Sequence, residues 1–169
     1  SAGVVRYAPV GQVDEAELRA QLELDFVVPY LVSQRVGSAM RARGRGAIVH
    51  IASTLGLRPA PDTSAYGASK AALIAATQAF ALELAPNVRV NAIAPGIVDT
   101  GMVRVLRREV GEGDAPRATA LAEQMAGFAR LHPLGRMGKA EEIARAVLYL
   151  LDAEWVTGTV MTVDGGVSL

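Results

Sequence analysis

The sequence predicts an α/β protein whose parallel sheet is covered by helices on both faces. Three short apolar runs, at 47–52, 88–94 and 160–163, have the length and the flanking glycine, proline or serine of buried strands. Longer segments with apolar residues three and four apart predict helices around and between these runs. Because helices separate the strands, each connection has to be a crossover, and crossovers join parallel strands.

The helical segments follow from the spacing of apolar side chains. The segment 14–42 has an expected core-facing stripe made of Leu18, Leu22, Phe26, Pro29, Val36 and Met40. The segment 66–85 places four residues on one face, namely Leu73, Thr77, Phe80 and Leu84. The segment 140–151 begins with two glutamates, which the helix dipole favours in a first turn. Residues 101–130 are polar and helical in tendency, with glycine interruptions.

The composition narrows the function classes. A length of 169 residues suits one domain, and 17 basic against 17 acidic residues leave no net charge. That balance argues against a nucleic acid or an anionic membrane as partner. There is no cysteine, which is compatible with the reducing cytoplasm where we expect the protein. We expect no metal site, because His50 and His132 lack companions at ligand spacing; we interpret them as a strand and a loop residue.

Tyr66 and Lys70 are four residues apart in a predicted helix and therefore share one face. A nearby ammonium favours a phenolate and lowers the pKa of the phenol, so that it can exchange a proton with a carbonyl or alcohol oxygen. Ser53 follows the strand 47–52, at the edge where parallel sheets bind ligands, and a loop of Gly and Pro leads from it to Tyr66. Its hydroxyl can donate to the same substrate oxygen. The alternative is a chance helix pair and a turn serine that satisfies its own backbone.

Five motifs, in this order, resemble the short-chain dehydrogenase/reductase family over essentially the whole chain. They are His50-Ile-Ala-Ser-Thr-Leu-Gly56, Tyr66-Gly-Ala-Ser-Lys70, Asn91-Ala-Ile-Ala-Pro-Gly-Ile-Val-Asp-Thr100, His132-Pro-Leu-Gly-Arg-Met-Gly138, and Val156-Thr-Gly158 through Val163-Asp-Gly-Gly166. The resemblance implies one Rossmann-like domain over 1–169, with a doubly wound parallel sheet made of the family's strands four to seven. It also implies an enzyme that uses NAD or NADP to interconvert a carbonyl and a secondary alcohol.

The resemblance also implies roles for particular residues. Tyr66 would be the general acid/base, Ser53 would orient the substrate oxygen, and Lys70 would hold the nicotinamide ribose and lower the tyrosine pKa. The residues expected to border the cofactor are Ser1, Ala2, Gly3, Tyr66, Lys70, Pro95, Gly96, Val98 and Thr100. Residues 101–130 would form a substrate lid; an ordinary pair of surface helices is the alternative.

Asp25 departs from the family pattern, which usually has asparagine here as a fourth active-site residue. That asparagine helps to hold a water in a proton relay to the lysine. Pro29 has no N–H, so it cannot give the Asp25 carbonyl its helical hydrogen bond, and we expect this carbonyl to keep the relay. Two other readings stay open: the carboxylate pairs with Lys70 and alters the pH profile, or it is a solvated acid on a helix.

A second departure is the missing glycine-rich turn that seats the cofactor pyrophosphate at the family's N-terminus. No glycines here have that spacing. We therefore expect a longer natural polypeptide, with roughly 80–90 further residues in three strand–helix units. The choice between NAD and NADP stays open, because the residues that read the adenosine ribose belong to that part.

The expected partners are a small carbonyl or alcohol substrate and further copies of the chain, as a homodimer or homotetramer. By resemblance, the helices at 14–42 and 66–85 pair across subunits, and small residues would permit their close approach, namely Ala71, Ala72, Ala75 and Ala76. One alternative is a non-catalytic member of the family that acts through oligomerisation or partner binding. Another is the extended epimerase/dehydratase branch, which shares the Tyr/Lys pair.

Overall fold

The computed structural model describes residues 3–104 and 117–169 of the chain. Its helices are α1 (Glu15–Leu22), α2 (Val28–Ala42), α3 (Ser64–Leu84), α4 (Arg117–Arg130) and α5 (Ala140–Asp152). Its strands are β1 (Gly46–Ile51), β2 (Val88–Pro95) and β3 (Val160–Val163). A π-helical turn, Glu23–Val27, joins α1 to α2, and a 3-10 turn, Thr54–Gly56, follows β1.

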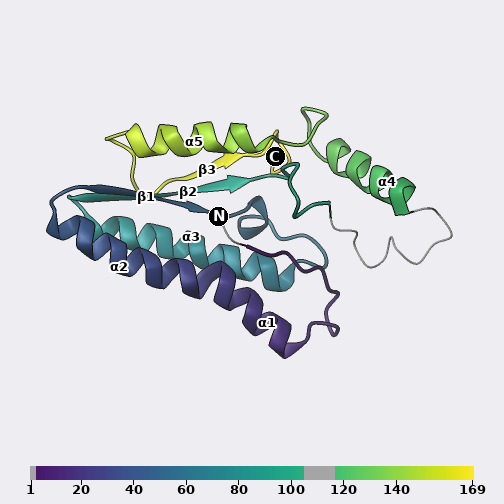
Figure 1. Cartoon of the computed structure of the whole chain (residues 1–169), viewed down its shortest axis with the longest axis horizontal. Coiled ribbons are helices and arrows are strands. Elements are labelled where there is room, and N and C mark those ends of the chain that lie inside the picture. Colours follow the sequence, from purple (N-terminus) through teal and green to yellow (C-terminus); the bar gives the residue numbers. More distant parts are fainter. Residues whose placement is uncertain (1–2, 105–116) are drawn as a thin grey trace.

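The strands form a parallel sheet in the order β1-β2-β3, with Ile48 beside Val90 and Ala94 beside Thr162. Helices α1, α2 and α3 lie along one face of this sheet and α5 lies along the other (Figure 1). The predicted α/β class with a covered parallel sheet is confirmed. Since the strands are parallel, their carboxyl ends lie at one rim, and the segments that leave β1, β2 and β3 start there.

The core lies mainly between α3 and β2. All four residues of the predicted α3 face are buried: Leu73, Thr77, Phe80 and Leu84. Along the central strand β2, the side chains of Val90, Ala92, Ile93 and Ala94 are fully inaccessible. Burial of aliphatic side chains on this scale is the main stabilising contribution to such a layer.

The predicted stripe for 14–42 is wrong at Val36, whereas Phe26 and Met40 pack against the core as predicted. Val36 is exposed, and the buried positions of α2 are Ser33 and Gly37. In the turn, the Val28 N–H donates to the Glu23 carbonyl, five residues back instead of four. The wider turn changes which positions of α2 face the core, so that Ser33 and Gly37 are buried in place of Val36.

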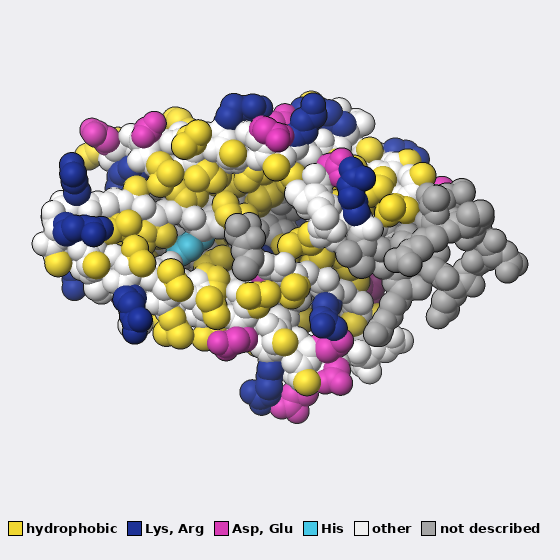
Figure 2. Space-filling view, viewed as in Figure 1, with side chains coloured by type: hydrophobic (Ala, Val, Ile, Leu, Met, Phe, Trp, Pro, Cys, Tyr) yellow, Lys and Arg dark blue, Asp and Glu magenta, His cyan; other side chains and the backbone are white. Residues whose placement is uncertain are grey.

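The sheet is open at one side within the described part of the chain. Strand β1 pairs with β2 alone, and the residues from Gly3 to Pro9 form no strand. Hydrophobic side chains gather over this edge, between α5 and α2 (Figure 2). No helix among residues 3–104 and 117–169 has both the length and the apolar character needed to cross a bilayer.

Candidate active site

Ser53 and Tyr66 meet at the rim of the sheet, each brought there by its own element. Ser53 follows β1 directly and caps the 3-10 turn, where its hydroxyl oxygen accepts from the Leu55 N–H at 3.1 Å. Tyr66 lies in the first turn of α3, and the Ser53 side chain also forms a hydrogen bond with its phenol. Both residues are buried. The capping bond and the bond to the phenol coexist, so the turn-serine reading and the site reading both describe Ser53.

Lys70 lies one turn further along α3, on the face of Tyr66. Its ammonium is 5.6 Å from the centre of the Tyr66 ring, donates to the Ile51 carbonyl at 3.2 Å, and lies 3.5 Å from Asp25 Oδ1. The 3-10 turn packs tightly here, since a Cβ on Gly56 would lie only 2.8 Å from the Lys70 carbonyl carbon. Glycine at this position therefore lets the Ser53 turn approach α3 closely.

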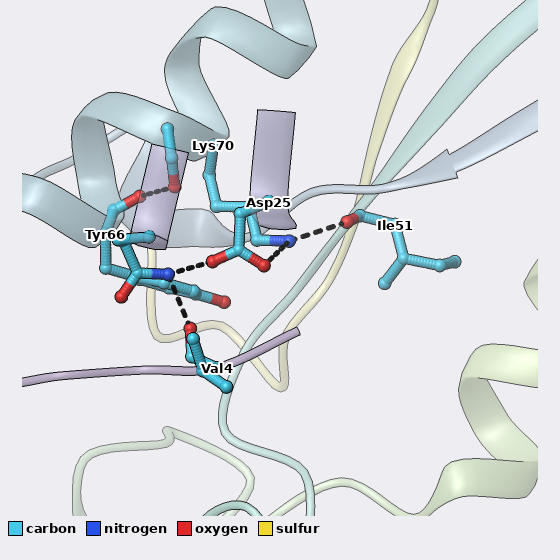
Figure 3. A network of polar contacts seen from close by, with 7 residues as sticks. Val4, Asp25, Ile51, Tyr66 and Lys70 are labelled. Atoms are coloured by element: carbon cyan, nitrogen blue, oxygen red, sulfur yellow. Dashed lines mark hydrogen bonds and ion pairs between the residues drawn. The ribbon is translucent and has the colours of Figure 1, made fainter. Parts of the chain in front are cut away.

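Asp25 is buried in the π-helical turn and forms an ion pair with Lys70 (Figure 3). Its side chain is 0% exposed, so the reading as a solvated acid is wrong, and the reading as a partner of Lys70 is the one that the structure contains. Burial raises the pKa of the Asp25 carboxyl, against the opposing effects of Lys70, Gln21 and the Val4 N–H. Oδ2 accepts a hydrogen bond from Gln21, whereas the buried Oδ1 has the ion pair with Lys70 at 3.5 Å and no hydrogen-bond partner among the described residues.

The pKa of Tyr66 is raised to about 12. Burial is the largest cause, and the charge of Asp25 and the proximity of Tyr7 add to it, whereas the hydrogen bond from Ser53 lowers the pKa. The role predicted for Lys70 in lowering the pKa of this phenol stays a prediction; its ammonium lies 3.5 Å from Asp25 Oδ1, and the charge of Asp25 raises the phenol pKa. At neutral pH the phenol therefore keeps its proton.

The segment that leaves β2 is fixed to both neighbouring rim segments. The Thr54 hydroxyl donates to the Pro95 carbonyl at 3.2 Å, which ties the ends of β1 and β2 together. A Cβ on Gly96 would lie 2.9 Å from Asp164 and 3.0 Å from His132 Nε2. Gly96 is thus required by the close approach of the turn after β3, a reason that the motif alone did not indicate.

His132 supports the same segment from the other side. It is buried, its Nδ1 is 2.8 Å from the Phe128 carbonyl, and its Nε2 is 3.1 Å from the Ile97 N–H. A carbonyl only accepts, so the proton is on Nδ1 and Nε2 accepts from Ile97. The ring thereby connects the end of α4 to the loop after β2.

Val98 forms a short parallel bridge with Gly138. The Gly138 N–H donates to the Ile97 carbonyl and the Asp99 N–H donates to the Gly138 carbonyl, each at 2.9 Å. In such a bridge the N–H and carbonyl of Val98 itself face away from Gly138. Thr100, two residues on, is exposed, and its carbonyl accepts from Val103.

The other predicted positions lie near the chain's start and in the predicted lid. Gly3 is adjacent to Asp25, since a Cβ on it would lie 3.0 Å from Oδ1. Ser1 and Ala2 lie outside the described residues, as does 105–116 of the lid. Where the structure describes the chain, no group of three or more acidic, histidine or cysteine side chains is placed to hold a metal ion.

Two residues of this site were not found from the sequence: Gln21 and His132. Gln21 is buried beside Asp25 and contacts the backbone of Val4, and His132 contacts Ile97. Val4 is 17 residues from Gln21 and Ile97 is 35 residues from His132, so no local pattern marks these two contacts. A polar residue four positions before an acid was the only available signal for Gln21.

Comparison with known proteins gives one family. The family model described as enoyl-(acyl carrier protein) reductase matches residues 1–168. The 3-oxoacyl-(acyl-carrier-protein) reductase of Thermotoga maritima is 36% identical over 169 residues, which cover 98% of this chain and 63% of that protein. The chain therefore spans less than two thirds of this relative's length.

Solved structures agree. The ligand-free aldohexose dehydrogenase of Thermoplasma acidophilum superposes with a TM-score of 0.88 at 32% identity, over 99% of this chain and 66% of that one. A 4-hydroxyisoleucine dehydrogenase in complex with NADH and succinate gives a TM-score of 0.84 at 28% identity, over the same shares. The parallel sheet, the Ser53, Tyr66 and Lys70 cluster at its rim, and these matches lead to one conclusion: the chain belongs to the short-chain dehydrogenase/reductase family.

Proposed function

We propose that the full-length protein is an oxidoreductase that uses NAD or NADP to interconvert a carbonyl and a secondary alcohol. The observation that carries the proposal is the contact of the Ser53 hydroxyl with the Tyr66 phenol, at the sheet rim and with the Lys70 ammonium 5.6 Å from the ring. Two hydroxyls that meet in this way can both bind one substrate oxygen, and one of them can exchange a proton with it.

In the reductive direction, Tyr66 is the proton donor. Its raised pKa, about 12, keeps the phenol protonated at neutral pH, which suits a general acid. Ser53 orients the carbonyl oxygen toward the phenol and stabilises the charge that develops on it. Asp25 and Lys70 are the adjacent charged pair, and we propose that they govern how readily the proton returns to Tyr66.

The donor groups of this chain suit a nicotinamide cofactor, which supplies or accepts the hydride when bound. An ammonium has three hydrogens, and among the described residues Lys70 directs them to the Ile51 carbonyl and to Asp25, which leaves one for a ribose hydroxyl. The outward-facing backbone of Val98 suits a carboxamide. The remaining cofactor-lining positions that we propose are Ser1, Ala2, Gly3, Pro95, Gly96 and Thr100.

The substrate is a small molecule whose identity this chain does not specify. The names of the similar proteins range from an acyl-thioester reductase to a sugar dehydrogenase, which supports the carbonyl/alcohol chemistry and no single substrate. We further propose that 101–130 forms the substrate lid within the single domain. Self-association through α2 and α3, and a location in the cytoplasm, also remain proposals.

Replacing Tyr66 by phenylalanine tests the proposal. The variant removes the transferable proton and preserves the ring, so turnover of a carbonyl panel with NADH and NADPH should fall by roughly 10²–10⁴-fold. The dissociation constant of the reduced cofactor, measured by fluorescence, should change little. Tyr149→Phe removes the hydroxyl of an exposed tyrosine on α5 and is the matched control. Turnover by Tyr66→Phe close to that of the control would refute the role of Tyr66.

A further inference from the structure

Gln21 and Asp25 are two polar side chains, one helical turn apart, that are completely enclosed. Each is 1% exposed. The Gln21 Nε2 donates to the Val4 carbonyl at 2.7 Å and to Asp25 Oδ2 (Figure 3). The backbone of Val4 also lowers the pKa of the Asp25 carboxyl through a hydrogen bond. The Val4 peptide is therefore approached by Gln21 at its carbonyl and by Asp25 at its N–H.

The orientation of the Gln21 amide is determined by its neighbours. A carbonyl and a carboxylate can only accept, so both have to face the nitrogen, and both of its hydrogens are used. The Gln21 Oε1 is buried and has no hydrogen-bond partner among the described residues. A buried acceptor without a partner is unfavourable. The Gln21 side chain therefore serves as a donor through Nε2, and this orientation leaves Oε1 without a donor to accept from.

The Val4 carbonyl needs a hydrogen-bond donor, and the Asp25 carboxylate cannot supply one because it has no hydrogen to donate. An asparagine at 25, as is usual in the family, has both an N–H and a carbonyl, and could serve the Val4 carbonyl and N–H alone. With Gln21 present, however, an asparagine would direct its NH₂ group toward the Gln21 NH₂ or toward the Lys70 ammonium. Aspartate at position 25 is therefore compatible with glutamine at position 21, whereas asparagine at position 25 is not.

We propose that Gln21 is a positioning residue that acts with Asp25 as a split pair, in which the glutamine supplies the donor and the aspartate the acceptor that one asparagine amide would supply. The pair fixes Val4, which follows the cofactor-lining position Gly3, and it holds the Asp25 carboxylate against Lys70. The catalytic consequence rests on the function proposed above. The pairing itself does not, because it concerns contacts of this chain alone.

A double-variant cycle in the full-length protein tests the pairing: Gln21→Leu, Asp25→Asn and both together. Gln21→Leu keeps the side-chain volume but leaves the Val4 carbonyl and Asp25 Oδ2 without their donor. We expect kcat to fall at least tenfold, with a smaller change in KM, and Tm to fall by several degrees. Adding Asp25→Asn should recover at least fivefold of the lost kcat and most of the lost Tm, since the new amide can donate to Val4. Gln34→Leu, at an exposed position of α2, is the matched control.

The measurements distinguish a Gln21–Asp25 pairing from a glutamine that only fills space. Recovery in the double variant supports the pairing, because a residue that merely fills space would not be rescued by a change at its neighbour. Gln21→Leu within twofold of wild type in kcat and unchanged in Tm, or a double variant no better than Gln21→Leu, overturns it. Should Gln21→Leu not fold, folding of the double variant supports the pairing and its failure to fold overturns it. If the wild type turns over no carbonyl, the proposed function fails, and the Tm values still decide the pairing.

Discussion

At the scale of single residues, a polar chain crosses the core through His50. Its Nε2 lies 2.7 Å from the Ser33 hydroxyl, and its Nδ1 lies 2.8 Å from the Thr77 hydroxyl, which itself donates to the Leu73 carbonyl at 2.8 Å. Since the hydrogen of Thr77 is used, Nδ1–H donates to it and Nε2 accepts from Ser33. The imidazole is neutral with both nitrogens satisfied, and it links α2, β1 and α3.

His50 should make stability depend on pH. Burial lowers its pKa to about 4 from the ordinary 6.5. Between these pH values the unfolded state binds a proton that the folded state does not. The contribution of His50 to the free energy of unfolding is therefore fully present above pH 6.5, and it is lost as the pH drops toward 4. The loss from this one group is about 3 kcal/mol at about pH 4.

Urea unfolding of wild type and of His50→Asn, at about pH 7.5 and about pH 4, measures this contribution. The wild type should lose about 3 kcal/mol more between the two pH values than the variant does. An equal loss in both proteins would show that the imidazole is not held neutral by the fold.

The residues of the candidate site differ in how far the sequence could predict them. Ser53, Tyr66 and Lys70 were found because each has a local signal, a strand end or a four-residue helical spacing. Gln21 and His132 have partners 17 and 35 residues away, and only the packed fold brings them together. Asp25 was singled out because the family usually has asparagine at this position. Its burial depends on the π-helical turn, which no local sequence pattern predicted.

At the scale of elements, the close contact of the 3-10 turn with α3 should be essential. A methyl group on Gly56 would meet the backbone of Lys70 and Ala71 at 2.8 and 2.9 Å. We expect Gly56→Ala to displace the turn that carries Ser53, to lower turnover at least tenfold, and to cost about 1–3 kcal/mol in the free energy of unfolding.

Kinetics and urea unfolding of the same preparation check both effects. Leu57→Ala changes an exposed neighbour in that turn, so its stability should stay within about 0.5 kcal/mol of wild type. Should Gly56→Ala be as stable and as active as wild type, the tight contact would not govern the placement of Ser53.

The elements also show where periodicity predicts packing and where it fails. The α3 face was predicted correctly, because one uninterrupted helix keeps a single spacing from Leu73 to Leu84. The stripe of the preceding helix failed at Val36, after the π-helical turn before Pro29, whose missing N–H interrupts the regular bonding pattern. A proline marks a possible irregularity, but the sequence does not reveal whether the helix kinks, ends or widens there.

At the scale of the whole molecule, the outer surface of α2 and α3 is apolar in a way that suggests contact with another copy. Its exposed hydrophobic side chains are Leu31, Val32, Val36 and Leu82. Ala71 and Ala75 are exposed as well, whereas Ala76 belongs to the core. Exposed apolar surface of this kind is typical of association sites.

The full-length protein should therefore elute as a dimer or tetramer in light scattering coupled to gel filtration. Introducing charge through Val32→Glu together with Leu82→Glu should lower the mass toward that of one chain, because a like-charged pair would be buried across the interface. Val10→Glu, at an exposed loop position, is the control and should keep the wild-type mass. A charged variant that associates like wild type would place the contact elsewhere.

The route of the chain around the rim separates two tasks. One continuous stretch, Ser53–Lys70, carries the hydroxyl, the phenol and the ammonium, whereas the chain that leaves β2 at Pro95 forms the neighbouring segment of the rim. If the proposed function holds, an exchange of that second stretch between relatives should change which molecule is accepted and leave Ser53, Tyr66 and Lys70 in place. The groups proposed to handle the proton and the segment proposed to contact the substrate therefore belong to separate stretches of the chain, and either stretch can change without the other.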